Sequence, residues 1–498
     1  MSVDYKKLLE KIDKQIEEGP FKDNWESLSK YQVPDWYKDI KFGIFIHWGV
    51  YSAAAYANEW YPRNMYIKDS DEYKHHIETY GPHKDFGYKD YIPMLTGANF
   101  DADKWLKLFE DCKAQYMVPV AEHHDGFQMY ASEISEWNAA KMGPHKDIIG
   151  ELMNAADKTS VVFGVSSHRI EHWWFLGHGR EFESDIKGEF ERGHIYWPSM
   201  EEPDTHFNTT PANPPTAEYM EDWLIRTCEI VDRFHPAILY FDWWIEIEAL
   251  RPYLKKALAY YYNAMAKIGR MGVVNYKHDE ILQGCAVPTV ERGQFADIKP
   301  YVWQTDTSTC FNSWGYTVNN RYKEPQDIVC DLVDVVSKNG RMLLNIGPKP
   351  DGTITDEETA ILQNIGKWLS VGSEGLYGCH TYKVFGEGPL KIEEGMFKDA
   401  EAKVFSSKDF RFTVNKGNIY VYALGNSEDG IYRIETFGRK NADDSPKYLG
   451  RILKVVLPGT QEEGKLDKEL AFEMRDDALE IKCDKKSRYP LVFKLEVL

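Results

Sequence analysis

Cysteine is scarce in this sequence and long apolar runs are missing, and both shortages exclude whole classes of protein. The seven cysteines are odd in number, irregularly spaced and without a Cys-x-x-Cys pair, so neither a disulfide framework nor a cysteine zinc site is expected. No stretch approaches the ~20 apolar residues of a membrane span. Residues 1–19 lack the apolar core of a secretory signal, which favours a cytoplasmic protein; a secreted protein whose leader has been removed is the alternative.

Positive charge is also in short supply. The chain has 60 Lys and Arg against 79 Asp and Glu, a formal net charge of −19, which argues against nucleic acid as a partner because a polyanion would be repelled. Aromatic residues, in contrast, make up 14% of the chain, with 15 Trp and 31 Tyr. Large aromatic faces pack cores and also stack on sugar rings, so this composition favours a carbohydrate ligand.

Short apolar runs alternate with amphipathic helical patterns from about residue 40 to 370. Continuous apolar strands that alternate with helices are covered on both faces, which predicts a parallel sheet. Seven or eight such units over this length favour closure into a (β/α)8 barrel. The runs lie at 43–49, 116–124, 161–168, 237–244, 272–277, 301–306 and 341–348, with a less clear one at 286–293.

The pattern changes after about residue 382. A Gly- and Pro-containing connector is followed by short stretches that alternate apolar and polar residues between turn signals. This period of two predicts a small antiparallel β-sandwich. We therefore expect a catalytic barrel domain over 1–380 and a C-terminal β-sandwich domain over 381–498.

Chemically active side chains recur at the ends of the predicted strands. In a (β/α)8 barrel the carboxyl ends of the strands and the loops after them build the active site, so these side chains are expected to meet in one mouth. One histidine at a strand end is usually structural, but recurrence on strand after strand is hard to assign to chance. The residues are His47, His123, His124, His168, Asp242, Lys277 and Glu291.

Two carboxylates suit glycoside hydrolysis. Asp242 interrupts an apolar, aromatic strand, where an unpaired carboxylate is costly to bury; it is either paired with a nearby Lys or Arg, or held as a nucleophile beneath a sugar ring. Glu291 is either a surface partner of Arg292 or a general acid whose pKa is raised by burial or by Asp242. The spacing alone does not make the two neighbours, but the barrel does.

The pair His123 and His124 raises the question of a metal. Adjacent side chains on a strand point to opposite faces, and no third ligand stands at His-x-x-x-His spacing. We therefore expect no metal and no organic cofactor. Imidazoles that hydrogen-bond sugar hydroxyls fit better, and His47 belongs to the same set. Glu59 adds a carboxylate for hydroxyls, and Trp60 adds an indole for stacking.

At these residues the sequence resembles glycoside hydrolase family 29, the retaining α-L-fucosidases. The matching segments occur in family order across about 40–375, and the β-rich tail also fits the family. They are KFGIFIHWGVYSAAAYANEWYPRNMY, VAEHHDGFQMYAS, LYFDWW, VNYKHD followed by VERG, FNSWGY, and VDVVSKNGRMLLNIGPKPDGTI.

The resemblance implies that Asp242 is the nucleophile and that the acid/base, whose position varies within the family, is Glu291. It also implies a group of side chains that hold the fucose: His47, Glu59, Trp60, His123 and His124. Two departures stand out. The segment VSSHRIEHWW replaces a tyrosine-containing one, so His168 or Glu171 contributes differently. Lys277 stands where some relatives place an arginine near the sugar, and Lys does not reproduce a bidentate fork.

The expected reaction is exo-acting double displacement on terminal α-L-fucosyl groups of oligosaccharides or glycoconjugates. Retention requires the two carboxyl groups to lie about 5–5.5 Å apart. Phe45, Trp243 and Trp314 are candidates for an apolar wall against the fucose methyl group. If Glu291 is not the acid/base, Glu246 or Glu248 takes its place. The alternatives are α-L-galactosidase specificity on the same scaffold and a non-catalytic sugar-binding protein. A second copy of the chain is a further partner that the sequence allows.

Overall fold

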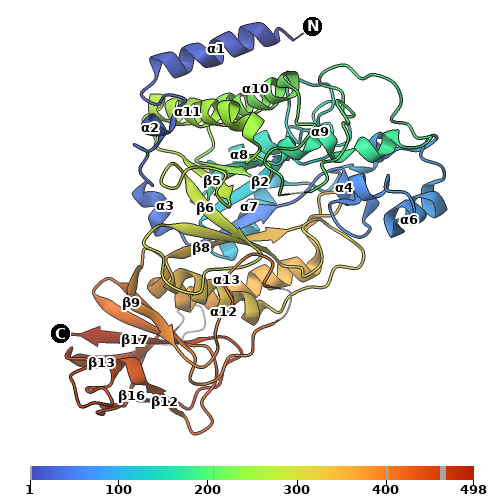
Figure 1. The fold of residues 1–498 in the computed structure, drawn as a ribbon. Coiled ribbons are helices and arrows are strands. Elements are labelled where there is room, and N and C mark those ends of the chain that lie inside the picture. Colours follow the sequence, from blue (N-terminus) through green and yellow to red (C-terminus); the bar gives the residue numbers. More distant parts are fainter. Residues whose placement is uncertain (1–2, 206, 400–401, 460–466) are drawn as a thin grey trace.

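Eight parallel strands close into a barrel in chain order (Figure 1). The computed structural model describes residues 3–205, 207–399, 402–459 and 467–498. All eight apolar runs, the less clear one included, overlap a strand, so the predicted barrel is confirmed. The strands are β1 (Phe42–Ile46), β2 (Tyr116–Glu122), β3 (Val162–Ser167), β4 (Ile238–Phe241), β5 (Val273–Lys277), β6 (Val287–Glu291), β7 (Trp303–Ser308) and β8 (Gly340–Ile346).

Long helices follow the strands and bury an apolar face against the barrel. Several begin at a side chain that accepts a hydrogen bond from the first turn, as Asp101, Thr216 and Thr355 do, which satisfies amide groups that have no partner within the helix. The long helices are α7 (Ala102–Asp111), α8 (Ile148–Ala156), α10 (Ala217–Phe234), α11 (Arg251–Lys267), α12 (Pro325–Ser337) and α13 (Asp356–Leu376).

The N-terminal helix α1 (Tyr5–Glu18) packs on α10 and α11 through the buried Ile12 and Ile16. Among the described residues, no helix combines the length and the apolar character needed to cross a membrane. The remaining helical elements lie in the loops: α2 (Trp25–Leu28), α3 (Asp35–Asp39), α4 (Tyr51–Ala54), α5 (Tyr61–Asn64), α6 (Asp71–Tyr80), α9 (His172–Phe175), and the 3-10 turns Tyr88–Met94, Arg169–Glu171, Gly177–Arg180, Glu248–Leu250 and Glu435–Phe437.

Large side chains fill the barrel interior below the carboxyl ends of the strands. Tyr116, Val118, Ile238 and Leu343 are fully buried in one cluster there, and the Arg341 guanidinium lies 4.5 Å from the ring centroid of Tyr37. The floor is therefore closed, and space for a ligand remains at the carboxyl ends of the strands.

Two antiparallel sheets follow the barrel, as predicted (Figure 1). One has six strands in the order β14-β13-β17-β11-β10-β9, and the other has three in the order β12-β16-β15. Their facing side chains form a separate core that includes Phe412, Tyr432, Ile481 and Phe493. The strands are β9 (His380–Glu387), β10 (Phe410–Asn415), β11 (Asn418–Ala423), β12 (Ile431–Ile434), β13 (Ile452–Leu457), β14 (Lys468–Leu470), β15 (Phe472–Met474), β16 (Leu479–Lys482) and β17 (Leu491–Val497).

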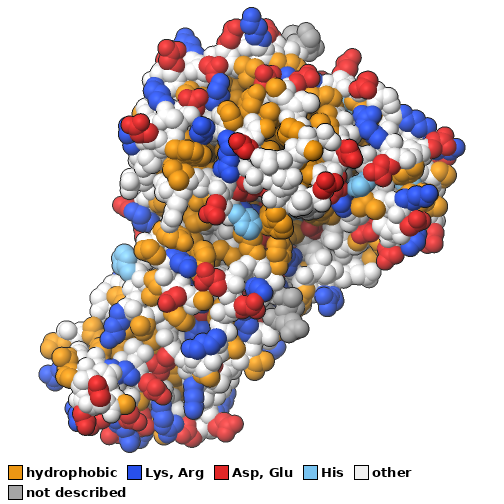
Figure 2. Space-filling model, in the orientation of Figure 1, with side chains coloured by type: hydrophobic (Ala, Val, Ile, Leu, Met, Phe, Trp, Pro, Cys, Tyr) orange, Lys and Arg blue, Asp and Glu red, His pale blue; other side chains and the backbone are white. Residues whose placement is uncertain are grey.

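The sandwich is joined to the barrel by buried charges. Arg411 in β10 pairs with Asp334 in α12, and Lys338 lies 2.5 Å from the same carboxylate. We propose that the domain boundary falls at about residue 380, where β9 begins. Over the face seen in Figure 2, acidic and basic side chains are interspersed, and no basic patch gathers there.

Candidate active site

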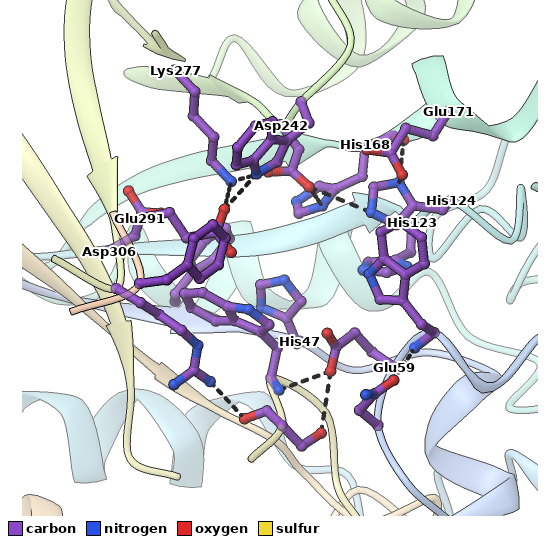
Figure 3. A pocket seen from close by; sticks show the side chains of 18 of the residues that line it. His47, Glu59, His123, His124, His168, Glu171, Asp242, Lys277, Glu291 and Asp306 are labelled. Atoms are coloured by element: carbon purple, nitrogen blue, oxygen red, sulfur yellow. Dashed lines mark hydrogen bonds and ion pairs between the residues drawn. The ribbon is translucent and has the colours of Figure 1, made fainter. Parts of the chain in front are cut away.

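A cavity of about 600 Å³ opens at the carboxyl ends of the barrel strands. Its walls come from strands β1, β4, β5, β6 and β7 and from the loops that follow the strands, including those after β2 and β3 (Figure 3). The barrel thus brings together side chains from widely separated parts of the chain. Every residue that we predicted for the site lines it: His47, Glu59, Trp60, His123, His124, Asp242, Lys277, Glu291 and Trp314.

Asp242 follows the last residue of β4 and points into this cavity (Figure 3). Its Oδ1 forms an ion pair with Lys277 Nζ. Its Oδ2 lies 3.0 Å from His168 Nδ1 and 3.4 Å from His124 Nε2. The carboxylate is therefore paired with a lysine, as one sequence interpretation required, but the pair lies inside the cavity and keeps the carboxylate facing it.

The surroundings keep Asp242 ionised. Burial alone would raise its pKa, but the Lys277 ammonium and the bonds from His168 and His124 hold the pKa well below its usual value. Burial would likewise lower the pKa of Lys277, and Asp242 and Glu291 together raise it well above the usual value. An ionised carboxylate with no proton to lose is the state that a nucleophile needs.

Glu291, the last residue of β6, faces the same ammonium. Lys277 Nζ lies 2.6 Å from its Oε2, and the indole N–H of Trp243 donates to the same oxygen. Arg292, the partner expected for a surface pair, instead donates to the carbonyl oxygens of Cys310 and Ser313. Glu291 is buried beside Asp242, and the surface interpretation was wrong.

One ammonium thus bonds both carboxylates. Two hydrogen bonds of about 2.8 Å meeting at one nitrogen place the bonded oxygens at most roughly 5.6 Å apart. Retaining glycosidases need a separation of about 5–5.5 Å, whereas inverting enzymes need roughly 6.5 Å or more to admit a water. The pairing of Asp242 and Glu291 with Lys277 therefore fits retention. Lys277, which we expected at the sugar, lies between the two carboxylates.

Histidines form the floor of the cavity. His47 Nδ1 lies 2.6 Å from Asn345 Oδ1, and the rings of His123 and His168 have centroids 5.0 Å apart. Burial lowers the pKa of all three, His47, His123 and His168, so they are neutral at pH 7. His47 Nδ1 bonds Asn345, and the two nitrogens of His168 face Asp242 and Ser166, so hydroxyl groups of a ligand are left with His47 Nε2 and the ring of His123.

The expectation that His123 and His124 point to opposite faces was wrong. β2 ends at Glu122, so both residues lie beyond the strand, and both line the cavity with ring centroids 4.2 Å apart. Donor atoms of His47, His123 and His168 lie within 4.8 Å of one another. This geometry offers nitrogen atoms to a metal as well as to a sugar, so the argument against a metal from side-chain direction fails.

His124 differs from its neighbours because two carboxylates face it. Its Nδ1 lies 3.2 Å from Glu171 Oε2, and its Nε2 faces Asp242. Burial lowers the pKa of His124, but Glu171 and Asp242 outweigh burial and raise it to about 9. Burial raises the pKa of Glu171 to about 8, with His124 acting against it. Both pKa values are thus raised next to the nucleophile, while His124 Nδ1 donates to the carbonyl oxygen of His168 at 2.9 Å.

Glu59 and the two predicted indoles form the opposite wall. Glu59 Oε2 accepts from the backbone N–H of Trp314 at 2.9 Å and from Ser313 Oγ at 3.2 Å, so this carboxylate fixes the loop that carries Trp314. The Trp314 ring lies 5.1 Å from the ring of His47, and the Trp60 ring lies 5.6 Å from that of His124. The indoles flank the histidine floor.

Asp306 in β7 lines the cavity, and the sequence did not single it out. Its Oδ2 accepts from Tyr240 OH at 3.0 Å, and burial raises its pKa to about 7. The only available signal was its position in the run 301–306, which β7 continues to Ser308. Glu171 had been considered only as a departure from the family pattern, yet it is buried against His124.

A family model described as alpha-L-fucosidase matches residues 8–374. The tissue alpha-L-fucosidase of Rattus norvegicus is 28% identical over 73% of this chain and 74% of its own. The plasma alpha-L-fucosidase of Homo sapiens is 30% identical over 73% of each chain. A crystal structure of Thermotoga maritima alpha-fucosidase in complex with fucose covers 95% of this chain with a TM-score of 0.71 and 28% identity, and all of that chain is covered. The matched model, the barrel and the paired carboxylates agree: the chain belongs to the alpha-L-fucosidase family of glycoside hydrolases.

Proposed function

We propose that the protein removes terminal α-L-fucosyl groups from glycans, with Asp242 as nucleophile and Glu291 as general acid and base. The single observation that carries these roles is Lys277 Nζ, which bonds both carboxylates across the cavity. This pairing supports the proposal because it would hold Glu291 near the scissile oxygen and Asp242, as an anion, beneath the sugar.

In the first step, Asp242 attacks the anomeric carbon while Glu291 protonates the departing glycosidic oxygen. The bond from C1 to that oxygen breaks, and an ester between fucose and Asp242 forms. In the second step, Glu291 deprotonates a water that attacks C1, and the ester bond breaks. L-Fucose leaves with the configuration it had in the substrate.

Lys277 serves both steps. Before attack its charge is balanced by ionised Asp242 while Glu291 carries the proton. After attack the Asp242 charge is consumed in the ester, and Glu291 has become the anion. The ammonium, which contacts both carboxylates, then balances Glu291. The net charge of the three buried groups stays constant, so no uncompensated charge has to be created in a site shielded from water.

The neutral imidazoles of His47 and His123 suit the ring hydroxyls, while His168 bonds Asp242 and Ser166. Trp243 donates to Glu291 and therefore lies on the leaving-group side. Of the three candidates for the apolar wall, this leaves Phe45 and Trp314 to face the fucose methyl group. The Phe45 ring lies 4.5 Å from that of His47.

The test is covalent trapping. A 2-deoxy-2-fluoro-α-L-fucosyl fluoride should add one fluorofucosyl group to the protein, and peptide mapping should place it on Asp242. Asp242→Ala should remove nearly all turnover of an aryl α-L-fucoside, keep the fold and accept no label. NMR should show α-L-fucose as the first product. An aryl α-L-galactoside serves as the specificity control. Label on another residue, or a β-anomer first, would refute the assignment.

We further propose that the protein works in a reducing compartment, as in the cytoplasm. All seven cysteines are unpaired and buried. A thiol count on the unfolded protein purified without reductant should give the full number, and a disulfide would contradict the proposal.

A further inference from the structure

Two exposed phenylalanines stand at the mouth of the cavity. In the described chain, the side chains of Phe, Trp and Tyr are at least half-buried except for Phe207 and Phe397, which are 73% and 55% exposed. Both line the active-site cavity. An exposed aromatic side chain is unfavourable in water unless something covers it, and here both exposed rings are at the same opening.

Trp243 links these rings to the catalytic carboxylates. Its ring is nearly parallel to that of Phe397, with an interplanar angle of 19° and centroids 6.1 Å apart, and it meets the edge of Phe207 at 5.9 Å. Because two stacked aromatic faces with a sugar between them would need about 7 Å or more, Trp243 and Phe397 form an offset pair. They present one continuous surface, and the indole N–H of that surface donates to Glu291.

The backbone holds Phe397 in place. The connector that carries it runs beside the end of β6, where the Phe397 N–H donates to the Glu291 carbonyl at 2.9 Å and the Lys398 N–H donates to that of Arg292 at 2.7 Å. This close approach requires glycine: a Cβ on Gly293 would lie 1.9 Å from the Gly395 carbonyl oxygen. Phe397 itself has a left-handed φ of 55°, which is unfavourable for a non-glycine residue.

We propose that Phe397, Phe207 and Trp243 form a binding site for the leaving group, and that its occupant is the neutral pyranose ring attached to the fucose. This inference rests on the proposed role of Glu291. Glu291 must protonate the oxygen that joins the two sugars, so the first leaving-group ring lies next to Glu291 and hence over Trp243. The apolar C–H face of a pyranose matches the aromatic surface and covers the exposed rings.

The connector that carries Phe397 is hydrogen-bonded to the end of β6, the strand that carries Glu291. It therefore places the leaving-group site next to the acid/base. Phe397 follows the first strand of the C-terminal sheet, β9, in the chain and reaches back to β6. Phe207 comes from the loop between β3 and α10. Two segments far from the catalytic residues in sequence would thus set which glycans fit.

The test compares two substrates of the full-length enzyme. α-L-Fucosyl fluoride has no leaving-group ring and occupies only the fucose site. The second substrate is the fastest-cleaved member of a panel of α1,2-, α1,3-, α1,4- and α1,6-linked fucosyl disaccharides. For Phe397→Ala and Phe207→Ala we expect the ratio of kcat/KM, disaccharide over fluoride, to fall about 10-fold, mainly through KM. Phe397→Tyr should restore the ratio.

Leu449→Ala is the matched control, because Leu449 is a large apolar side chain that is 84% exposed in the C-terminal domain and should leave the ratio as it is. An equal loss on both substrates in the Phe397 and Phe207 variants would show that these residues only support the fold, and unchanged ratios would show that no leaving-group ring binds there. Either result overturns the inference. A wild-type enzyme that does not hydrolyse the fluoride would instead refute the proposed function.

Discussion

Lys277 Nζ lies 2.6 Å from Glu291 Oε2 while the same ammonium pairs with Asp242. This contact determines how the charges of Asp242 and Glu291 are balanced. A single buried cation makes ionised Asp242 favourable despite burial, and it remains available for Glu291 when Asp242 becomes an ester. Removing the cation should therefore disturb both steps.

The first prediction concerns Lys277→Met, which keeps the length of the side chain and removes its charge. Burial raises the pKa of Asp242 and Lys277 opposes it, so without Lys277 the pKa of Asp242 rises. Because Asp242 must be ionised to attack, the acidic limb of the kcat/KM profile should move to higher pH, and kcat/KM at pH 7 should fall by about 100-fold or more. The measurement is a pH profile with an aryl α-L-fucoside.

The matched control for that profile is Lys299→Met. Lys299 pairs with Glu394 at 3.3 Å outside the cavity, so its loss should not move either limb. If Lys277→Met keeps the wild-type acidic limb, Asp242 does not depend on Lys277 for its charge.

A second prediction separates Glu291 from other acidic residues. Glu291→Ala should lower kcat/KM by about 100-fold or more for fucosyl disaccharides, whose leaving groups need protonation, and much less for aryl fucosides with acidic phenols. Azide should raise the rate of the variant on the activated substrate by attacking the fucosyl ester of Asp242, and it should give an α-fucosyl azide. Glu246→Ala and Glu248→Ala are the comparison variants, because neither side chain lines the cavity. Azide rescue of Glu246→Ala instead would reassign the acid/base.

The barrel and much of the site could be predicted from the sequence because a parallel barrel concentrates its signals. Strands covered on both faces become continuous apolar runs, and all eight were recognisable. Each run that ends in a polar residue, such as Asp242 or Lys277, delivers that residue to the common mouth. Such residues can be found without knowing any distance between them.

Other features depend on details that an apolar pattern does not carry. His123 and His124 face the same cavity because β2 stops at Glu122, and the apolar pattern does not fix that last residue. Asp306 ends the run 301–306, a signal that we did not use, although β7 itself continues to Ser308. Phe397 reaches the cavity through the close approach of two glycine-containing segments more than 100 residues apart in the chain, which no local pattern encodes.

A third prediction uses Glu171→Gln. The amide keeps the size of the side chain but removes the negative charge that is the main cause opposing burial in the pKa of His124, about 9 in the native protein. The pKa of His124 should therefore fall, and His124 should lose its proton at a lower pH. The basic limb of the kcat/KM profile should move to lower pH while the acidic limb stays in place.

Glu181→Gln is the control, because Glu181 contacts the partly exposed His178; it should leave both limbs unchanged. If Glu171→Gln and wild type have the same basic limb, that limb does not report the loss of a proton from His124.

The last prediction concerns the joint between the barrel and the β-sandwich. Asp334 in α12 is fully buried and pairs with Arg411 from β10 and with Lys338 at 2.5 Å. Arg411→Met removes one partner and leaves a carboxylate with incomplete compensation away from water, which typically costs about 3–5 kcal/mol. We expect the urea midpoint of unfolding to fall clearly, while kcat/KM of the folded enzyme stays near wild type because Arg411 does not line the cavity.

Arg433→Met is the matched control. Its side chain is half-exposed and pairs with Asp429 and Glu480 at the surface. Surface ion pairs contribute little to stability, so the midpoint of this variant should stay close to wild type. Equal midpoints for the two variants would mean that the buried pair does not stabilise the joint.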